Sequence, residues 1–95
     1  MAIAVLVEGA GFSQSLYDKV ANEVMPGGRL PAGCLFHMGG PTENGGWRVV
    51  DMWESQEAFE RFSRETLGPA MAKAGYTQRP DVKFWPVHNT RHALT

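Results

Sequence analysis

The sequence has 95 residues, the length of one domain, and its 43% hydrophobic and 20% charged residues are an ordinary globular composition. The formal net charge of -1, with Lys and Arg scattered, excludes the basic excess that binding to nucleic acid or to an anionic membrane surface needs. No apolar run approaches the ~20 residues of a membrane-spanning helix. The single cysteine, Cys34, cannot form an internal disulfide, so we expect a cytoplasmic protein.

The first half of the chain predicts a strand, a helix and a second strand. Residues 3–7 are apolar, β-branched and too few for a helix, which favours a buried strand. Ser13 is a good helix N-cap, and apolar residues then recur at four-residue steps through Val24, which indicates an amphipathic helix of about three turns. A Pro-Gly-Gly sequence ends this helix, and residues 34–39 form the second strand.

A hairpin and a second helix follow. Asn44-Gly45 lies between two apolar runs, a strong hairpin signal, so the second strand should pair antiparallel with a third strand over residues 47–54. Ser55 is placed to cap the second helix. Gly68-Pro69 should break or kink that helix, because proline lacks the N–H that the helix needs.

The last element is a fourth strand over residues 81–88. Pro86 inside it cannot donate to a strand ladder, so we expect an edge strand or a bulged one. The order is then βαββαβ, the ferredoxin-like α+β arrangement, with two helices on one face of a four-stranded antiparallel sheet. Residues 1–95 form one domain, and residues 89–95 are expected to be a flexible tail.

The third strand predicts which face of the sheet the helices leave open. Because a buried carboxylate needs a partner, we expect Val50 and Met52 to lie under the helices. The opposite face then carries Trp47, Val49, Asp51 and Trp53. An open apolar patch of this kind usually marks an interface or a ligand groove, so we expect a two-fold homodimer.

The chain here resembles a known superfamily. The residues that carry the resemblance are the stretch GWRVVDMWESQEAF over 46–59 and Leu-Gly-Pro-Ala over 67–70. A third strand that ends in Trp-Glu-Ser and runs into a helix with Glu-Ala-Phe is similar to the dimeric α/β-barrel superfamily, which includes the antibiotic-biosynthesis-monooxygenase-like domains. The resemblance implies two sheets packed face to face across a two-fold axis, and a pocket between each sheet and its helices. Members of the superfamily include oxygenases, isomerases, cyclases and haem enzymes.

His37 and Asp51 are the candidate catalytic residues. A hairpin loop over 42–46 places them opposite one another on neighbouring strands, with their Cβ atoms about 5 Å apart. An Asp–His pair fixes the tautomer of the imidazole and raises its basicity, as a general base requires. Two alternatives remain: a structural hydrogen bond in the dimer core, or a two-residue turn at Asn44-Gly45 that shifts the register and removes the contact.

Aromatic residues are the candidate ligand-binding residues. Trp47, Trp53 and Trp85 would suit a flat aromatic ligand, although such residues are more often core or interface. Tyr17 could point its hydroxyl into a pocket, but its spacing from Phe12 favours a hydrophobic staple at the start of its helix. His88 lies at the rim of the predicted pocket.

We expect neither a metal nor another cofactor. The three histidines are spread over positions 37, 88 and 92 without metal-ligand spacing, and no glycine-rich nucleotide loop is present. Neither predicted helix carries the axial histidine that a haem-degrading relative needs.

Together these expectations favour a small-molecule enzyme. It would be a cofactor-independent oxygenase, cyclase or isomerase that acts on an aromatic or polyketide-like substrate. One alternative is a non-catalytic, small-molecule-binding or stress-related homodimer. Another is an interaction module that pairs with other proteins through its edge strand.

Overall fold

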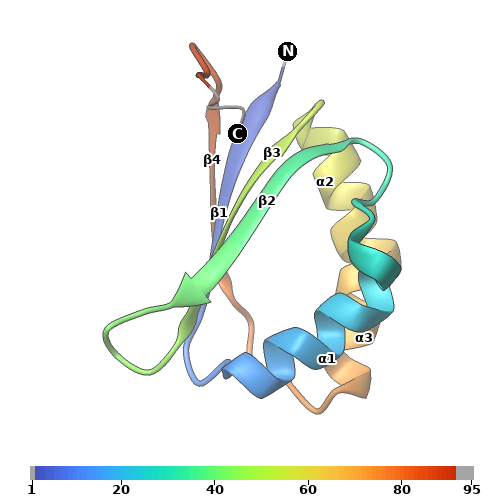
Figure 1. The fold of residues 1–95 in the computed structure, drawn as a ribbon, viewed down its shortest axis with the longest axis vertical. Helices are drawn as coiled ribbons and strands as arrows, with labels where there is room; N and C mark the ends of the chain where they lie inside the picture. Colours follow the sequence, from blue (N-terminus) through green and yellow to red (C-terminus); the bar gives the residue numbers. More distant parts are fainter. Residues whose placement is uncertain (1, 92–95) are drawn as a thin grey trace.

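The computed structural model describes residues 2–91 as a four-stranded sheet with its helices on one face (Figure 1). The strand order is β2-β3-β1-β4, and all neighbours are antiparallel. This confirms the predicted ferredoxin-like βαββαβ arrangement and places β4 at an edge. In chain order the elements are β1 Ile3–Gly9, α1 Gln14–Val24, a 3-10 turn Pro26–Gly28, β2 Cys34–Pro41, β3 Trp47–Trp53, α2 Gln56–Phe62, a π-helical stretch Ser63–Leu67, α3 Gly68–Lys73 and β4 Asp81–Pro86.

Both predicted helix caps are present. The Ser13 hydroxyl accepts from the N–H of Leu16 at 3.2 Å, and the Ser55 hydroxyl accepts from the N–H of Ala58 at 3.1 Å. Each cap satisfies an N–H that the first turn of a helix leaves unpaired, which is why the helices begin directly after these serines.

Gly68-Pro69 widens the second helix without ending it. Pro69 has no N–H and its ring crowds the carbonyl four residues earlier, so the ordinary helical pattern cannot pass through it. Instead the N–H of Gly68 bonds the Ser63 carbonyl, five residues back, and the helix continues as α3. This π-helical turn carries Leu67, which packs on the core and lines the cavity described below.

The β2–β3 hairpin has the longer of the two loops considered above. Pro41 pairs with Trp47, and His37 pairs with Asp51. Gly45 takes the left-handed conformation at φ 80° inside the loop. The predicted His37–Asp51 pairing is therefore confirmed, and the two-residue turn is wrong.

The two faces of the sheet are the reverse of those predicted from the third strand. Val50 and Met52 lie on the open face, in a hollow that contains no helix residue. The prediction was wrong because it treated a carboxylate under the helices as unpartnered, whereas Asp51 accepts two side-chain hydrogen bonds there. The set that faces the helices is Trp47, Val49, Asp51 and Trp53.

The buried core forms two clusters at the two ends of β3. One contains Trp47 with residues of α1 and α3 and Tyr76. The other contains Trp53 with Val5 and Phe59. The two tryptophans are six residue steps apart along the strand, which is about 20 Å at 3.3 Å per residue. Asp51 lies on β3 between these clusters and lines the same cavity as both tryptophans.

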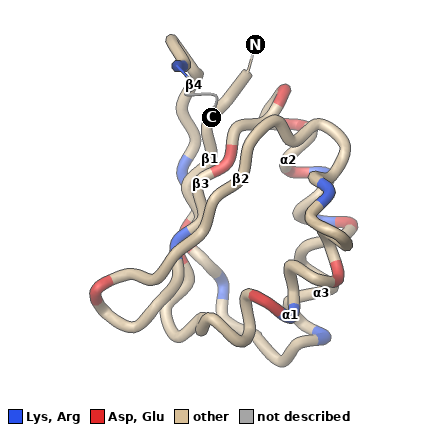
Figure 2. Tube along the Cα trace, viewed as in Figure 1, with Lys and Arg blue, Asp and Glu red and all other residues tan. Residues whose placement is uncertain are grey.

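The open face of the sheet combines exposed apolar side chains with one ion pair. Phe36, Met38 and Trp85 are 39%, 54% and 46% exposed there. Arg48 and Glu8 form an ion pair of 2.9 Å on the same face. Elsewhere charges of both signs are scattered over the surface (Figure 2). Among residues 2–91, no helix is long and apolar enough to cross a membrane.

The predicted tail is described only in part. Residues 89–91 follow β4 without forming a helix or strand, and residues 92–95, which include His92, lie outside the described residues.

Candidate functional site

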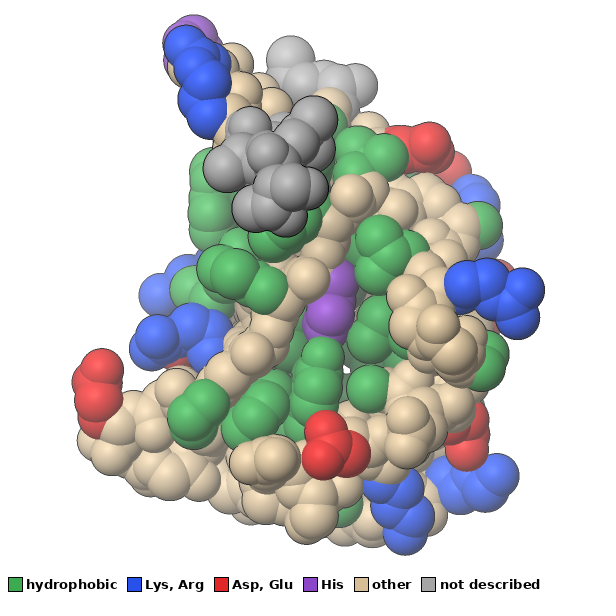
Figure 3. All heavy atoms as spheres, viewed as in Figure 1, with side chains coloured by type: hydrophobic (Ala, Val, Ile, Leu, Met, Phe, Trp, Pro, Cys, Tyr) green, Lys and Arg blue, Asp and Glu red, His purple; other side chains and the backbone are tan. Residues whose placement is uncertain are grey.

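A cavity of about 80 Å³ lies between the sheet and the helices. Its wall is mostly apolar and combines residues of all three helices with residues of β1, β2 and β3. Figure 3 shows this hollow from the side where β2 and the helices part, with a histidine side chain visible inside it. The ionisable side chains on its wall are Tyr17, Cys34, His37, Asp51 and Tyr76.

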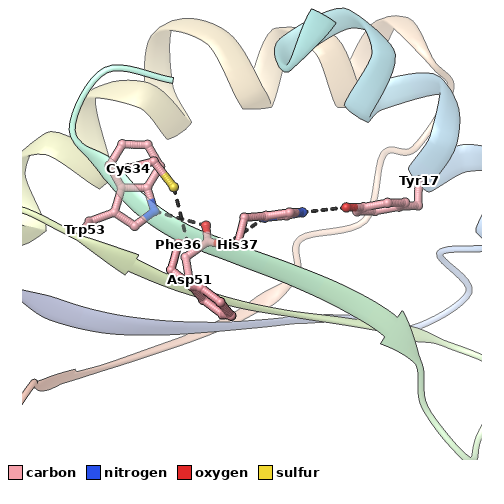
Figure 4. Close-up of polar contacts among 6 residues, drawn as sticks. All are labelled: Tyr17, Cys34, Phe36, His37, Asp51 and Trp53. Carbon is pink, nitrogen blue, oxygen red and sulfur yellow. Dashed lines mark hydrogen bonds and ion pairs between the residues drawn. The ribbon is translucent and has the colours of Figure 1, made fainter. Parts of the chain in front are cut away.

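Four of the lining side chains form one chain of hydrogen bonds (Figure 4). Tyr17 Oη lies 2.5 Å from His37 Nε2. His37 Nδ1 lies 2.7 Å from Asp51 Oδ1, and Trp53 Nε1 donates to Asp51 Oδ2 at 3.0 Å. The chain joins the first turn of α1 to the two strands of the hairpin and spans the cavity.

The direction of these hydrogen bonds follows from what each group can do. The indole N–H of Trp53 can only donate, and a carboxylate can only accept, so Asp51 takes its second hydrogen bond from the Nδ1–H of His37. A neutral imidazole has one N–H, which leaves His37 Nε2 as an acceptor for the hydroxyl of Tyr17. In this arrangement the neutral imidazole has its acceptor nitrogen, Nε2, on the side of Tyr17.

Burial and nearby negative charge act on the other ionisable groups of the site. Burial raises the pKa of the Tyr17 phenol, and the charges of Asp51 and Asp18 raise it further. The phenol therefore remains a proton donor at neutral pH. Burial and the Asp51 charge also raise the pKa of the Cys34 thiol to about 11, so this cysteine is a poor nucleophile near pH 7.

Trp47 contributes an unsatisfied donor to the wall. Its indole Nε1 is buried and has no hydrogen-bond partner within residues 2–91. The ring stacks on Tyr17, with the ring centroids 5.0 Å apart and the planes at 30°. Most buried polar groups in proteins have a partner, so this N–H requires an explanation.

The structure brings together five of the seven predicted site residues. Tyr17, His37, Trp47, Asp51 and Trp53 all line the cavity. The exceptions are Trp85 and His88, which lie at the hollow on the other face of the sheet. Tyr17 shows features of both roles considered for it, because its ring packs against the cluster that contains Phe12 and its hydroxyl contacts His37 in the pocket.

Sequence reasoning missed two features of the site. One is the hydrogen bond from Trp53 to Asp51. Its signal was available, because residues two apart on a strand share a face. The other is Gly39, where an added Cβ would lie 3.1 Å from Trp47 Nε1 and 3.2 Å from Tyr17 Cε1. No local pattern identifies this glycine, since the space that it leaves depends on a helix far away in the sequence.

No group of three or more His, Cys, Asp and Glu side chains that could hold a metal ion occurs in the described part of the chain.

Comparison by sequence finds no relatives. No family model matches the chain, and no curated protein matches it.

Comparison by structure finds several proteins of the same fold. SnoaB, a cofactor-independent oxygenase from Streptomyces nogalater, is 14% identical with a TM-score of 0.61, and the match covers 94% of each chain. A monooxygenase from the gene ActVA-Orf6 of Streptomyces coelicolor, solved in complex with nanaomycin D, is 18% identical with a TM-score of 0.60, covering 98% of this chain and 92% of that one. Rv0793 from Mycobacterium tuberculosis is 14% identical with a TM-score of 0.67, covering 97% of this chain and all of that one. The chain thus has the ferredoxin-like fold of the antibiotic-biosynthesis-monooxygenase-like proteins, as its sequence resemblance implied.

Proposed function

We propose that the protein is a small-molecule enzyme whose reaction begins when His37 Nε2 removes a proton from the substrate. The observation that carries this proposal is the hydrogen-bonded chain Tyr17–His37–Asp51–Trp53 on the wall of a mostly apolar cavity. Asp51 holds the imidazole with Nε2 facing the cavity, and its charge stabilises the imidazolium that forms when Nε2 takes a proton.

An aromatic or polyketide-like substrate fits the surroundings of this base. The wall includes the aromatic rings of Trp47 and Tyr17, which stack on one another, and an aromatic lining favours a planar ligand. Loss of a proton from a phenol or from a carbon beside a carbonyl gives an electron-rich phenolate or enolate. That anion is the nucleophile of a cyclisation, the intermediate of an isomerisation and the species that reacts with O₂. A cofactor-independent oxygenase, a cyclase and an isomerase therefore share this first step.

One observation favours the alternative, a non-catalytic, small-molecule-binding or stress-related protein. The cavity of about 80 Å³ is well below the ~300 Å³ of pockets that hold drug-sized ligands. A polyketide-sized substrate needs a side chain on the wall to move.

The assembly that we propose is a two-fold homodimer through the open sheet face. Phe36, Met38 and Trp85 are exposed at the centre of that face in the single chain. An exposed apolar patch of this kind is typical of a surface that a partner covers. Burial of apolar surface stabilises at roughly 25 cal/mol per Å², and a stable dimer buries more than roughly 1,200 Å² in total.

Proton abstraction can be tested before the natural substrate is known. β-Tetralone has an acidic C–H beside its carbonyl, and its exchange for deuterium in D₂O is followed by NMR. We expect the protein to accelerate this exchange and His37→Gln to reduce the acceleration by ~10²-fold or more. Equal exchange with wild type and His37→Gln would exclude the base and leave the binding protein as the better candidate.

A further inference from the structure

We propose that Tyr17 is a redox-active residue, which gives one electron to an organic peroxyl radical while its phenolic proton moves to His37 Nε2. The inference goes beyond the proposed function, because the proton that His37 accepts comes from the protein itself and no substrate has to enter the cavity. The activity is that of a radical scavenger.

The step balances in electrons and protons. One electron passes from the phenol to the peroxyl radical, and one proton passes from Oη of Tyr17 to Nε2 of His37. The products are a neutral tyrosyl radical, an imidazolium and a peroxide anion, which takes a proton from water. A one-electron reductant of the ascorbate class then reduces the tyrosyl radical, and the proton returns from Nε2 to the phenol oxygen.

The contact between Tyr17 and His37 is arranged for proton transfer. Tyr17 Oη lies 2.5 Å from His37 Nε2, and the two ring planes are 4° apart. Figure 4 shows both rings edge-on, with the hydrogen bond between them. The lone pair of an unprotonated imidazole nitrogen lies in the ring plane, so it is aimed at the phenol oxygen. The proton can therefore cross a short distance without rotation of either ring.

The surroundings keep the phenol protonated and prepare the base for its proton. Loss of an electron makes a phenol a strong acid, so a tyrosine is oxidised easily where a base receives the proton. Burial raises the pKa of Tyr17, and the charges of Asp51 and Asp18 raise it further, so the phenol and not the phenolate is the resting form. Asp51 accepts from His37 Nδ1 at 2.7 Å, and its charge stabilises the imidazolium.

The other aromatic donors on the cavity wall lack such a base. Tyr76 donates to the Ala10 carbonyl at 3.0 Å, and an amide carbonyl does not take up a proton near neutral pH. Trp53 donates to a carboxylate, which is a weaker base than an imidazole. The Nε1 of Trp47 is buried without a partner among residues 2–91. An oxidised indole that cannot release its proton keeps a positive charge in an apolar wall, which is unfavourable.

The position of Trp47 directs oxidation toward Tyr17. The two rings stack with their centroids 5.0 Å apart. Because Trp47 has no acceptor for its proton and Tyr17 has one, an electron lost from Trp47 is replaced from Tyr17. The two rings thus act as one donor, with the radical ending on the phenol.

An oxidant can reach this donor without entering the cavity. Tyr17 lies in the first turn of α1, and its side chain is partly exposed. An electron can leave through the exposed edge of the ring, whereas the proton uses a hydrogen bond that is already formed. The cavity of about 80 Å³ is therefore no restriction on this reaction.

The test uses hexachloroiridate(IV), a one-electron oxidant, and follows the loss of its colour by stopped flow with the full chain. All proteins carry Trp85→Phe, because Trp85 is 46% exposed and would itself reduce the oxidant. Tyr17→Phe should lower the rate about tenfold or more, since it removes the donor that has a base. Tyr76→Phe, the matched control, should not lower it.

His37→Gln separates a base from a structural neighbour. Glutamine can still accept a hydrogen bond from the phenol, but it cannot take up the proton. At neutral pH the rate should fall as far as in Tyr17→Phe, and it should rise with pH as the phenolate forms. With His37 present, the rate should be nearly independent of pH above neutrality and slower in D₂O. A His37 that only supports the fold would change neither the pH profile nor the isotope effect.

Rapid freezing and EPR identify the radical. The sequence has two tyrosines, so Tyr76→Phe leaves Tyr17 as the remaining one. We expect a neutral tyrosyl radical in that protein and none in Tyr17→Phe. Unfolding exposes the buried rings and raises the rate, so a loss of rate does not come from a misfolded variant. A tryptophan radical in place of the tyrosyl radical, or a rate that depends on neither Tyr17 nor His37, would overturn the inference.

A second series replaces the iridium oxidant by peroxyl radicals from a water-soluble azo initiator. Wild type should consume them faster than Tyr17→Phe and His37→Gln, and ascorbate should restore the tyrosine. Equal consumption by all three proteins would overturn the scavenging activity. The proposed function is tested separately, because β-tetralone exchange that depends on His37 would stand even if no tyrosyl radical forms.

Discussion

Replacing Asp51 by asparagine should reverse the tautomer of His37 while the side chain at position 51 still hydrogen-bonds both of its neighbours. The asparagine side chain keeps one oxygen and gains an NH₂ group, and both neighbours of Asp51, at 2.7 and 3.0 Å, are donors. Every hydrogen bond is satisfied only if the amide oxygen accepts from Trp53 and the NH₂ donates to His37 Nδ1. The proton of the imidazole then moves to Nε2, which must donate to Tyr17 and is no longer a base.

The size of the effect follows from the bonds that change. Two hydrogen bonds to a charged acceptor become two neutral ones, and each loses about 1 kcal/mol. The free energy of unfolding should fall by about 2 kcal/mol, a decrease in Tm of roughly 8–16 °C for a domain of this size. Proton abstraction from β-tetralone should fall by ~10²-fold or more, because the correct tautomer is lost.

The assay is a nitrogen–proton NMR correlation of the histidine rings, which distinguishes an Nδ1–H from an Nε2–H. The sequence has three histidines, and His37→Gln identifies the signal in question. Asp81→Asn, a change at an exposed carboxylate on β4, is the matched control and should shift stability by less than about 0.5 kcal/mol. The reasoning fails if wild-type His37 carries its proton on Nε2, or if Asp51→Asn leaves the proton on Nδ1.

Three further predictions concern the thiol, the open face and the hairpin. Because its pKa is about 11 rather than 9.0, Cys34 should react with iodoacetamide at pH 8 about 100-fold more slowly than a free thiol. The stability that the neutral thiol contributes should be lost as the pH rises from about 9 through 11. Fast alkylation at pH 8 would contradict the raised pKa and therefore both expectations. Light scattering should report twice the 10.5 kDa chain mass for the wild type and the single-chain mass for a variant with Met38 and Trp85 both changed to Glu; a wild type of 10.5 kDa would reject the proposed interface. An added Cβ at Gly46 would lie 2.7 Å from the Gly9 carbonyl oxygen, whereas an added Cβ at Gly40 would lie in open space. In urea unfolding, Gly46→Ala should therefore lower the free energy of unfolding by about 1–3 kcal/mol, and Gly40→Ala should not lower it. Equal unfolding midpoints for the two variants would refute this.

The elements of this fold were predictable because their signals are local. Ser13 and Ser55 begin the helices, since a cap depends only on the first turn that follows it. The loop over 42–46 set the register that places His37 opposite Asp51. What was not predictable is non-local. The contact between Tyr17 and His37 joins residues 20 apart through the way α1 crosses the sheet, which no period in the sequence encodes.

The wrong assignment of the sheet faces has a physical cause that bears on function. Binary patterning places a mid-strand carboxylate toward water, and Asp51 breaks that pattern. Burial of a carboxylate is tolerated only where donors surround it, and the donors here are His37 and Trp53. Trp85 was assigned to the wrong face for the opposite reason, because it is apolar but lies outside the core. Its apolar ring was assigned to the pocket, but it lies on the face that the helices leave open.

The same contacts that make a buried Asp51 tolerable also give the site its chemistry. Trp53 fixes the carboxylate, the carboxylate fixes the Nδ1 proton of His37, and Nε2 is left as the acceptor that faces the cavity. A fold that needed only a core would place an apolar residue at position 51, because a buried polar network is rarely more stable than good apolar packing. Sequences depart from local rules chiefly at functional sites, and the departure at Asp51 coincides with a second one, the unpartnered N–H of Trp47. Both exceptions lie on the wall of one cavity, and each is next to a residue that Tyr17 contacts or is itself in contact with Tyr17.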